Sequence, residues 1–185
     1  KLQVIEQKQG GIYAAKVPVS LGNFSSDQAR ALADFIEQYT GNEITFTIDQ
    51  QLIIRHIPEE QLRRVFGFLK EQNLSELGVN NTSQVTACPG TDTCNLAIAN
   101  STALALCCEA LLHERFQNHV KQTPSIKISG CMNSCGQHMI ANIGFQGMSI
   151  NAGKGKVMPA VQVLLGGANL KDGNAAFADK VIKIP

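Results

Sequence analysis

The sequence predicts an α+β protein, with a ferredoxin-like (split βαβ) unit over residues 1–78 and a second α+β domain over residues 79–185. Three observations predict this organisation. Strand-like and helix-like patterns follow one another over residues 11–72 in the order β-α-β-β-α. A polar connection covers residues 73–81. All six cysteines and most of the glycines lie beyond it, which marks a change of composition between two domains.

The first helix of the ferredoxin-like unit has a clear start signal. Residues 12–19 are rich in β-formers and precede it. Ser25 and Gln28 have the spacing of a capping box, in which each side chain bonds a backbone N–H of the other residue. Apolar residues then recur at helical spacing, at Leu32, Phe35, Ile36 and Tyr39.

The rest of the unit is expected to be a strand pair, a helix and a closing strand. Alternating apolar residues over 44–48 and an apolar run over 52–54 predict two strands joined by a turn. A second helix is expected to start near Pro58 and to bury residues with helical spacing. A strand near residues 85–86 is expected to complete the sheet of this unit.

The second domain is expected to contain one long helix and three strands. The helix is predicted over residues 95–116, and its positive end would face the loop before it. A strand at residues 126–128 leads into Gly130-Cys131. Further strands are expected over residues 140–145 and 161–165.

Bulk composition excludes some classes of function. Lys and Arg number 16, Asp and Glu number 15, and the net charge of +1 favours neither nucleic acid nor an anionic membrane as a partner. No apolar run approaches the about 20 residues that span a bilayer. The first residues lack a signal-peptide pattern. We therefore expect a cytoplasmic protein, in which six cysteines call for an explanation other than disulfides. The abrupt ends suggest a fragment.

Two cysteine pairs in glycine-containing loops carry the main chemical signal. Cys88 and Cys94 form C-x5-C, Cys131 and Cys135 form C-x3-C, and 36 residues separate the pairs. Four thiolates can ligate a [4Fe–4S] cube, one for each iron. Structural zinc also takes four cysteines, but its usual pairs have the spacing C-x2–4-C. Disulfides and unconnected buried thiols are the remaining alternatives.

Other candidate residues have weaker signals. Cys107 and Cys108 are adjacent on the predicted helix and are expected to fill the core. Asn133 lies between two cysteines and either bonds a cofactor or forms a local Asx turn. His138 follows the second pair closely. The other histidines, His56, His113 and His119, are expected on the surface or on a helix face.

The cysteine motif resembles that of assimilatory sirohaem nitrite and sulfite reductases. The loop Gly130-Cys131-Met132-Asn133-Ser134-Cys135-Gly136-Gln137 is similar to the family's G-C-P-N-S-C-G/A, although Met132 replaces the usual proline. Residues 143–147 and 163–167 follow in the family's order. Upstream, residues 47–54 resemble its T-x-x-Q-N-L-x-I strand pair, with Gln51 in place of the usual asparagine and Thr45 where arginine is frequent.

The resemblance implies an oxidoreductase with two cofactors. Cys88, Cys94, Cys131 and Cys135 would hold a [4Fe–4S] cluster, and Cys135 would also bridge it to the sirohaem iron, near Asn133. The chain would be the C-terminal part of an enzyme built from two halves. The absent N-terminal half would supply the substrate-binding Arg and Lys, and ferredoxin or a reductase would supply electrons.

The implied reaction is the six-electron reduction of nitrite to ammonia or of sulfite to sulfide. The sequence does not decide between these substrates. Two other functions remain open: a non-catalytic iron–sulfur electron-transfer domain, which would need only the four cysteines, and a zinc-stabilised interaction domain. The isolated chain is expected to fold but to be inactive.

Overall fold

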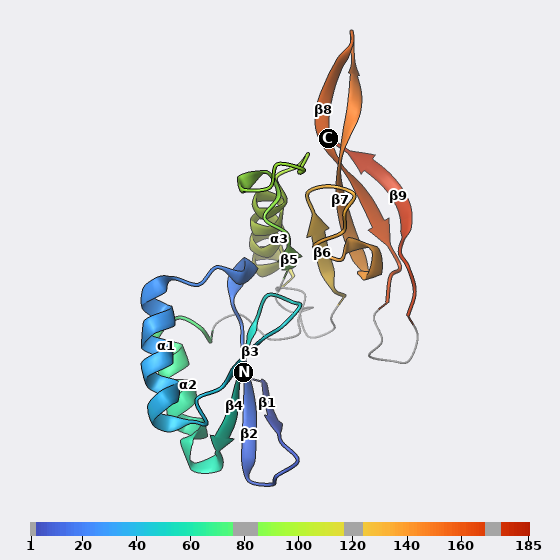
Figure 1. The fold of residues 1–185 in the computed structure, drawn as a ribbon. Helices are drawn as coiled ribbons and strands as arrows, with labels where there is room; N and C mark the ends of the chain where they lie inside the picture. The colour runs from blue at the N-terminus through green and yellow to red at the C-terminus, as the bar shows by residue number, and fades with distance from the viewer. Residues whose placement is uncertain (1–2, 76–84, 117–123, 169–174) are drawn as a thin grey trace. The chain divides into compact units, whose positions relative to one another are not determined.

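A computed structural model describes residues 3–75, 85–116, 124–168 and 175–185. The chain forms two compact units, Lys1–Asn80 and Asn81–Pro185 (Figure 1). The predicted boundary between residues 78 and 79 lies outside the described residues. The α+β class with a ferredoxin-like unit is confirmed, because one unit carries two helices on an antiparallel sheet and the other has a mixed sheet.

The first unit is a four-stranded antiparallel sheet with order β1-β2-β4-β3, covered on one face by α1 and α2 (Figure 1). Its strands are β1 (Gln3–Glu6), β2 (Ile12–Val17), β3 (Ile44–Phe46) and β4 (Leu52–Pro58), and its helices are α1 (Ser26–Tyr39) and α2 (Leu62–Glu71). The core lies between sheet and helices. Leu32 and Ile36 of α1 and Val65 and Leu69 of α2 are buried there against Ile54.

The start of α1 confirms the capping box. The Ser25 hydroxyl accepts from the Gln28 N–H at 3.1 Å, and the Gln28 side chain accepts from the Ser25 N–H at 3.1 Å. The same Gln28 amide donates to the backbone oxygen of Gln72 at 2.9 Å, just after α2. One side chain therefore caps the first helix and ties it to the end of the second.

One expectation for this unit is wrong. Its fourth strand is β1, which pairs with β2, whereas the strand near residues 85–86 belongs to the second unit. A short β-pattern fits either sheet, and only the tertiary partner decides. The expected helix start near Pro58 is confirmed: Pro58 is the last residue of β4 and the N-cap of a single turn, η2 (Glu59–Gln61), which leads directly into α2.

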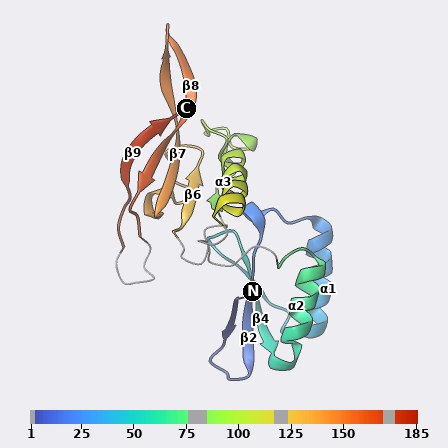
Figure 2. The same cartoon turned by 180° about the vertical axis from the view of Figure 1, so that it is seen from behind.

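The second unit is a mixed five-stranded sheet in the order β5-β6-β7-β8-β9. Its strands are β5 (Val85–Ala87), β6 (Ile126–Ser129), β7 (Ile143–Gly153), β8 (Lys156–Leu165) and β9 (Asp179–Ile184), and its helix is α3 (Ser101–Arg115). β5, β6 and β7 run parallel, while β8 and β9 are antiparallel to their neighbours. Helix α3 packs against β5 and β6, and Figure 2 shows it beside β6.

The predicted long helix starts later than expected, and two strands extend further. Ile98 and Ala99 both donate their N–H groups to the carbonyl of Gly130, at 2.8 and 3.0 Å, so this segment does not join the helix. Asn100 caps α3 by accepting from the Ala103 N–H. β7 and β8 form one long hairpin that turns at residues 154–155. Within the described residues, no helix has the length and apolarity needed to cross a bilayer.

Candidate metal centre

Both cysteine loops begin at the same edge of the second sheet. Cys88 directly follows β5, and Cys131 follows β6 after Gly130. The two strands are parallel and adjacent, with Ala87 in register with Ile128. Carboxyl ends of neighbouring parallel strands meet at one edge, where open sheets usually bind ligands. The fold therefore brings together two loops whose first cysteines are 43 positions apart by number (131 − 88).

Glycines let the two loops touch. A Cβ added at Gly130 would stand 2.8 Å from the Cα of Gly90 and 2.9 Å from the carbonyl oxygen of Ala99. At Gly90, which has a φ of +57°, an added Cβ would clash with the hydroxyl of Ser101. At Gly136 it would clash with the carbonyl of Ile128. The loops thus pack backbone to backbone, and no side chain fits between them.

The sulfur of Cys88 contacts both the second cysteine loop and helix α3. The Cys88 Sγ accepts a hydrogen bond from the N–H of Gly130 at 3.1 Å. The Ser101 hydroxyl donates to the Cys88 carbonyl at 2.6 Å and lies 3.5 Å from the Cys88 sulfur. Because Ser101 is the first residue of α3, the N-terminal end of that helix, which carries a partial positive charge, lies against Cys88.

The second loop turns tightly around Cys135. Ser134 and Gln137 both have left-handed backbones, with φ of 59° and 62°, and the Gln137 N–H donates to the Ser134 carbonyl at 2.7 Å. Ser129, the last residue of β6, accepts from the N–H of Gly136 at 3.0 Å. The strand thereby fixes the position of the residue next to Cys135.

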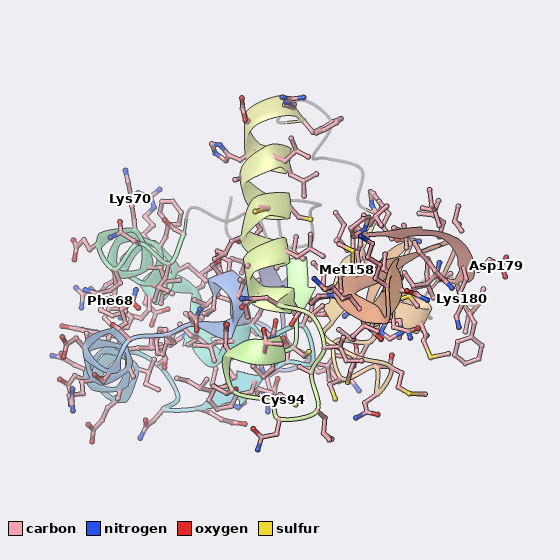
Figure 3. All side chains as sticks on the ribbon, turned by 90° about the horizontal axis from the view of Figure 1, so that it is seen from above. Phe68, Lys70, Cys94, Met158, Asp179 and Lys180 are labelled. Atoms are coloured by element: carbon pink, nitrogen blue, oxygen red, sulfur yellow. The ribbon has the colours of Figure 1, made fainter. Side chains whose placement is uncertain are left out.

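The four sulfurs differ in exposure. Cys131 is buried, Cys88 is partly buried, and Cys94 and Cys135 are exposed. Cys94 lies on the loop that leads into α3 (Figure 3). All six cysteines are free thiols. Across the described ranges, no three His, Cys, Asp or Glu side chains are grouped to hold a single metal ion. In a [4Fe–4S] cube each thiolate binds a different iron, so its ligands do not converge on one atom.

Other candidate residues near the loops lie in contrasting settings. Asn133 is exposed at the tip of the second loop. His138 is 1% exposed, and its Nδ1 is buried without a hydrogen-bond partner. Burial lowers the pKa of His138; a hydrogen bond with Gln146 opposes this shift, and the charge of Lys180 adds to it. His138 is therefore a neutral, buried residue beside the cysteine loop.

The expectation that Cys107 and Cys108 fill the core is wrong for Cys107, which is exposed, while Cys108 is half-buried. The helix turns only Ser101 and Ala105 fully inward. Burial, followed by the neighbouring Cys107 and Glu109, raises the pKa of the Cys108 thiol.

Two of the three remaining histidines lie within the described residues. His56 is on β4 in the other unit, where its Nε2 lies 2.8 Å from Glu43. His113 is exposed on α3. His119 falls outside the described residues.

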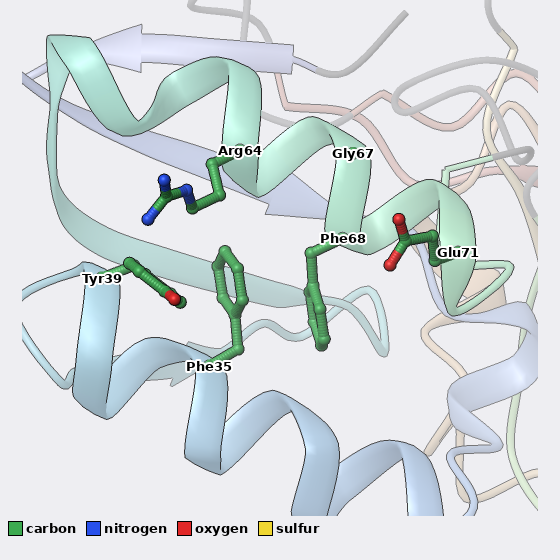
Figure 4. Close-up of a pocket in the computed structure, with 6 residues that line it drawn as sticks. All are labelled: Phe35, Tyr39, Arg64, Gly67, Phe68 and Glu71. Carbon is green, nitrogen blue, oxygen red and sulfur yellow. The ribbon is translucent and has the colours of Figure 1, made fainter.

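A shallow pocket of about 360 Å³ lies between α1 and α2 of the first unit (Figure 4). Phe35 stacks on Phe68 with ring centroids 4.1 Å apart, and the Arg64 guanidinium lies 4.4 Å from the centre of the Tyr39 ring. These contacts pair four of the six lining residues with one another. We therefore interpret the pocket as a gap in the packing of α1 against α2, and not as a ligand site.

Sequence reasoning missed two residues of the site. Ser101 contacts Cys88, and the buried Lys127 contacts Gln137. A serine at a helix start and a lysine in a strand carry no pattern that marks them as functional residues. One available signal was the alternation of polar and apolar residues over Ile126–Ser129, which predicts that Lys127 and Ser129 share one face of β6.

Comparison with known proteins adds sequence and fold relatives. Residues 5–72 match the nitrite/sulfite reductase ferredoxin-like half domain. The chain is 29% identical to a chloroplastic ferredoxin–nitrite reductase of Zea mays over 177 residues, which is 95% of the chain and 31% of that protein. It is 30% identical to a ferredoxin sulfite reductase of Mycobacterium tuberculosis over 166 residues, which is 88% of the chain and 30% of that protein.

Solved structures agree. The structure of the Mycobacterium tuberculosis NirA protein matches 99% of the chain and 34% of its own length, with a TM-score of 0.82 and 28% identity. Dissimilatory sulfite reductase I matches 94% of the chain and 58% of its own length with a TM-score of 0.74; at 10% identity this shows the fold alone. The resemblance to nitrite and sulfite reductases is thus confirmed in sequence and in fold. The chain spans about a third of the length of the curated relatives described.

Proposed function

We propose that Cys88, Cys94, Cys131 and Cys135 bind one [4Fe–4S] cluster within a nitrite or sulfite reductase. The observation that carries the proposal is the backbone contact between the two cysteine loops, at Gly90 and Gly130. The donor set suits the cluster, because soft thiolates are the usual ligands of iron–sulfur centres. The α3 N-terminus and the Gly130 N–H would stabilise the anionic thiolates.

The differing exposure of the sulfurs suggests a division of roles. Cys88 is partly buried and Cys131 is buried, so both would bind the cluster on its protein-facing side. Cys135 is exposed, which suits a ligand shared with a second cofactor. We propose that its thiolate bridges the cluster to the iron of sirohaem and that Asn133, exposed two residues earlier, bonds the cofactor pair. Sirohaem would supply the iron at which an oxyanion is reduced.

The rest of the enzyme would lie outside this chain. The relatives described above are about three times longer than this chain. We therefore propose that the remaining polypeptide covers the cofactors and supplies the Arg and Lys that bind the substrate. The names of the relatives include both nitrite and sulfite reductases that use ferredoxin. We therefore propose ferredoxin or a similar one-electron carrier as the donor and either oxyanion as the substrate.

The test is a comparison of the full-length enzyme with this 185-residue chain, both prepared without oxygen. The full-length enzyme should show sirohaem bands over the broad cluster absorption, and it should form ammonia from nitrite or sulfide from sulfite with reduced ferredoxin. The chain alone should do neither. A full-length protein that holds iron and sulfide but no sirohaem would instead be a non-catalytic iron–sulfur protein.

A further inference from the structure

We propose that Lys127 is a positioning residue whose buried ammonium group holds the Cys135 segment and raises the reduction potential of the cluster. This inference rests on the proposed function, since it requires the cluster. Lys127 lies in the middle of β6, with Thr86 of β5 on one side and Gly144 of β7 on the other. It is 4% exposed, which is rare for lysine.

The Lys127 side chain contacts the second cysteine loop. Its Nζ donates to the side-chain oxygen of Gln137 at 3.0 Å. Gln137 lies two residues after Cys135, at the left-handed position that closes the loop. Because strand side chains alternate, Lys127 and Ser129 project to the same face of β6. Ser129 holds the neighbouring Gly136 N–H. Two adjacent same-face residues thus fix consecutive positions of the loop.

Burial of Lys127 requires its ammonium group to be hydrogen-bonded, and the side-chain oxygen of Gln137 meets part of that requirement. Removing an ammonium group from water is unfavourable unless hydrogen bonds and opposite charge compensate it. A cluster with four thiolate ligands is anionic, and each added electron makes it more so. A fixed positive charge nearby therefore stabilises the reduced form more than the oxidised form. Net charge around a cluster is one of the factors that set its potential.

The experiment is a redox titration of the full-length enzyme followed by the EPR signal of the reduced cluster. Lys127→Met should shift the midpoint potential to a more negative value. We expect a roughly tenfold change in the ratio of reduced to oxidised cluster at a given potential, which is about 59 mV for one electron. Lys127→Arg should restore most of the potential. Lys183→Met, which removes an exposed lysine of β9, is the matched control and should leave it unchanged.

Each other outcome has a meaning. An unchanged potential in Lys127→Met with wild-type iron content overturns the inference while leaving the proposed function intact. Absence of cluster iron from the wild-type enzyme refutes the proposed function itself. If Lys127→Met loses its cluster, retention of the cluster in Lys127→Arg supports the need for a positive charge. Loss in Lys127→Arg as well would show that only the packing of lysine matters, and the inference would fail.

Discussion

The backbone N–H of Gly130 donates a hydrogen bond of 3.1 Å to the sulfur of Cys88, and this bond joins the two cysteine loops across 42 residues of sequence. It exists because β5 and β6 are parallel and end side by side. It also places Cys131, the next residue, close to Cys88. Hydrogen bonds to the cysteine sulfurs are one of the features by which a protein tunes an iron–sulfur centre.

Gly130→Ala should disrupt the site. The added Cβ would lie under 3 Å from the backbone of Gly90 and of Ala99, so the loops must move apart. We expect most of the cluster to be lost, as measured by iron and acid-labile sulfide per chain after anaerobic reconstitution. Gly67→Ala is the control: an added Cβ there meets no atom within 4 Å, and alanine favours a helix. Equal cluster content in the two variants would contradict the packing argument.

Ser101→Ala tests the link between α3 and the first loop. The variant loses a 2.6 Å hydrogen bond to the Cys88 carbonyl, which is donated by a serine that is 1% exposed. We expect the free energy of unfolding to fall by about 1–3 kcal/mol and the reconstituted cluster to be lost faster in air. Ser149→Ala removes an exposed hydroxyl from β7 and should behave as wild type. A Ser101→Ala protein as stable as Ser149→Ala would show that this contact is unimportant.

Local signals in the sequence were sufficient to predict the first helix and to place Cys88, Cys94, Cys131 and Cys135 in loops. The capping box at Ser25 and Gln28 involves residues three apart, so the sequence pattern contains the whole interaction. The start of α3 could not be predicted in the same way. The Gly130 carbonyl takes the N–H groups of Ile98 and Ala99 from about 30 residues away, and only the folded chain brings them together.

Strand partners and burial also depend on tertiary structure. Residues 85–87 have the same β-pattern whichever sheet they join, and the structure pairs them with β6. Cys107 is exposed because of the side of α3 that packs on the sheet. The sequence does not predict that side, since apolar residues are spread around the whole helix. The burial of Lys127 depends on loop residues that fold over β6.

Ser25→Ala should destabilise the first unit alone. Loss of the capping box is expected to lower the free energy of unfolding by about 1 kcal/mol. Both tyrosines of the chain, Tyr13 and Tyr39, lie in this unit and there is no tryptophan, so tyrosine fluorescence during urea unfolding reports on it. Ser26→Ala, one residue further on, is the control. A Ser25→Ala midpoint no lower than that of the control would argue against the cap.

The buried His138 should make the metal-free second unit less stable in mild acid. Its lowered pKa keeps it neutral in the folded state, whereas the unfolded state takes up a proton below about pH 6.5. The stability it contributes is therefore complete above that pH and is lost as the pH falls, by up to about 1.4 kcal/mol per unit.

Urea unfolding followed by circular dichroism at pH 7.5 and pH 5.5 checks this expectation. Wild type should lose more stability between these values than His138→Gln, which cannot titrate. His113→Gln removes an exposed histidine from α3 and should follow wild type. Parallel losses in wild type and His138→Gln would exclude the role of His138.

The most direct test of the central claim is the iron and sulfide content of the anaerobically reconstituted chain and its single cysteine variants. The shared-cluster account predicts about four irons and four sulfides per wild-type chain. It predicts severe loss in Cys88→Ser, Cys94→Ser and Cys131→Ser, because hydroxyl groups replace soft thiolates poorly. Cys107→Ser, whose sulfur lies exposed on α3, should keep its cluster. Full cluster occupancy in Cys94→Ser, or one zinc ion and no sulfide in the wild-type chain, would contradict the account.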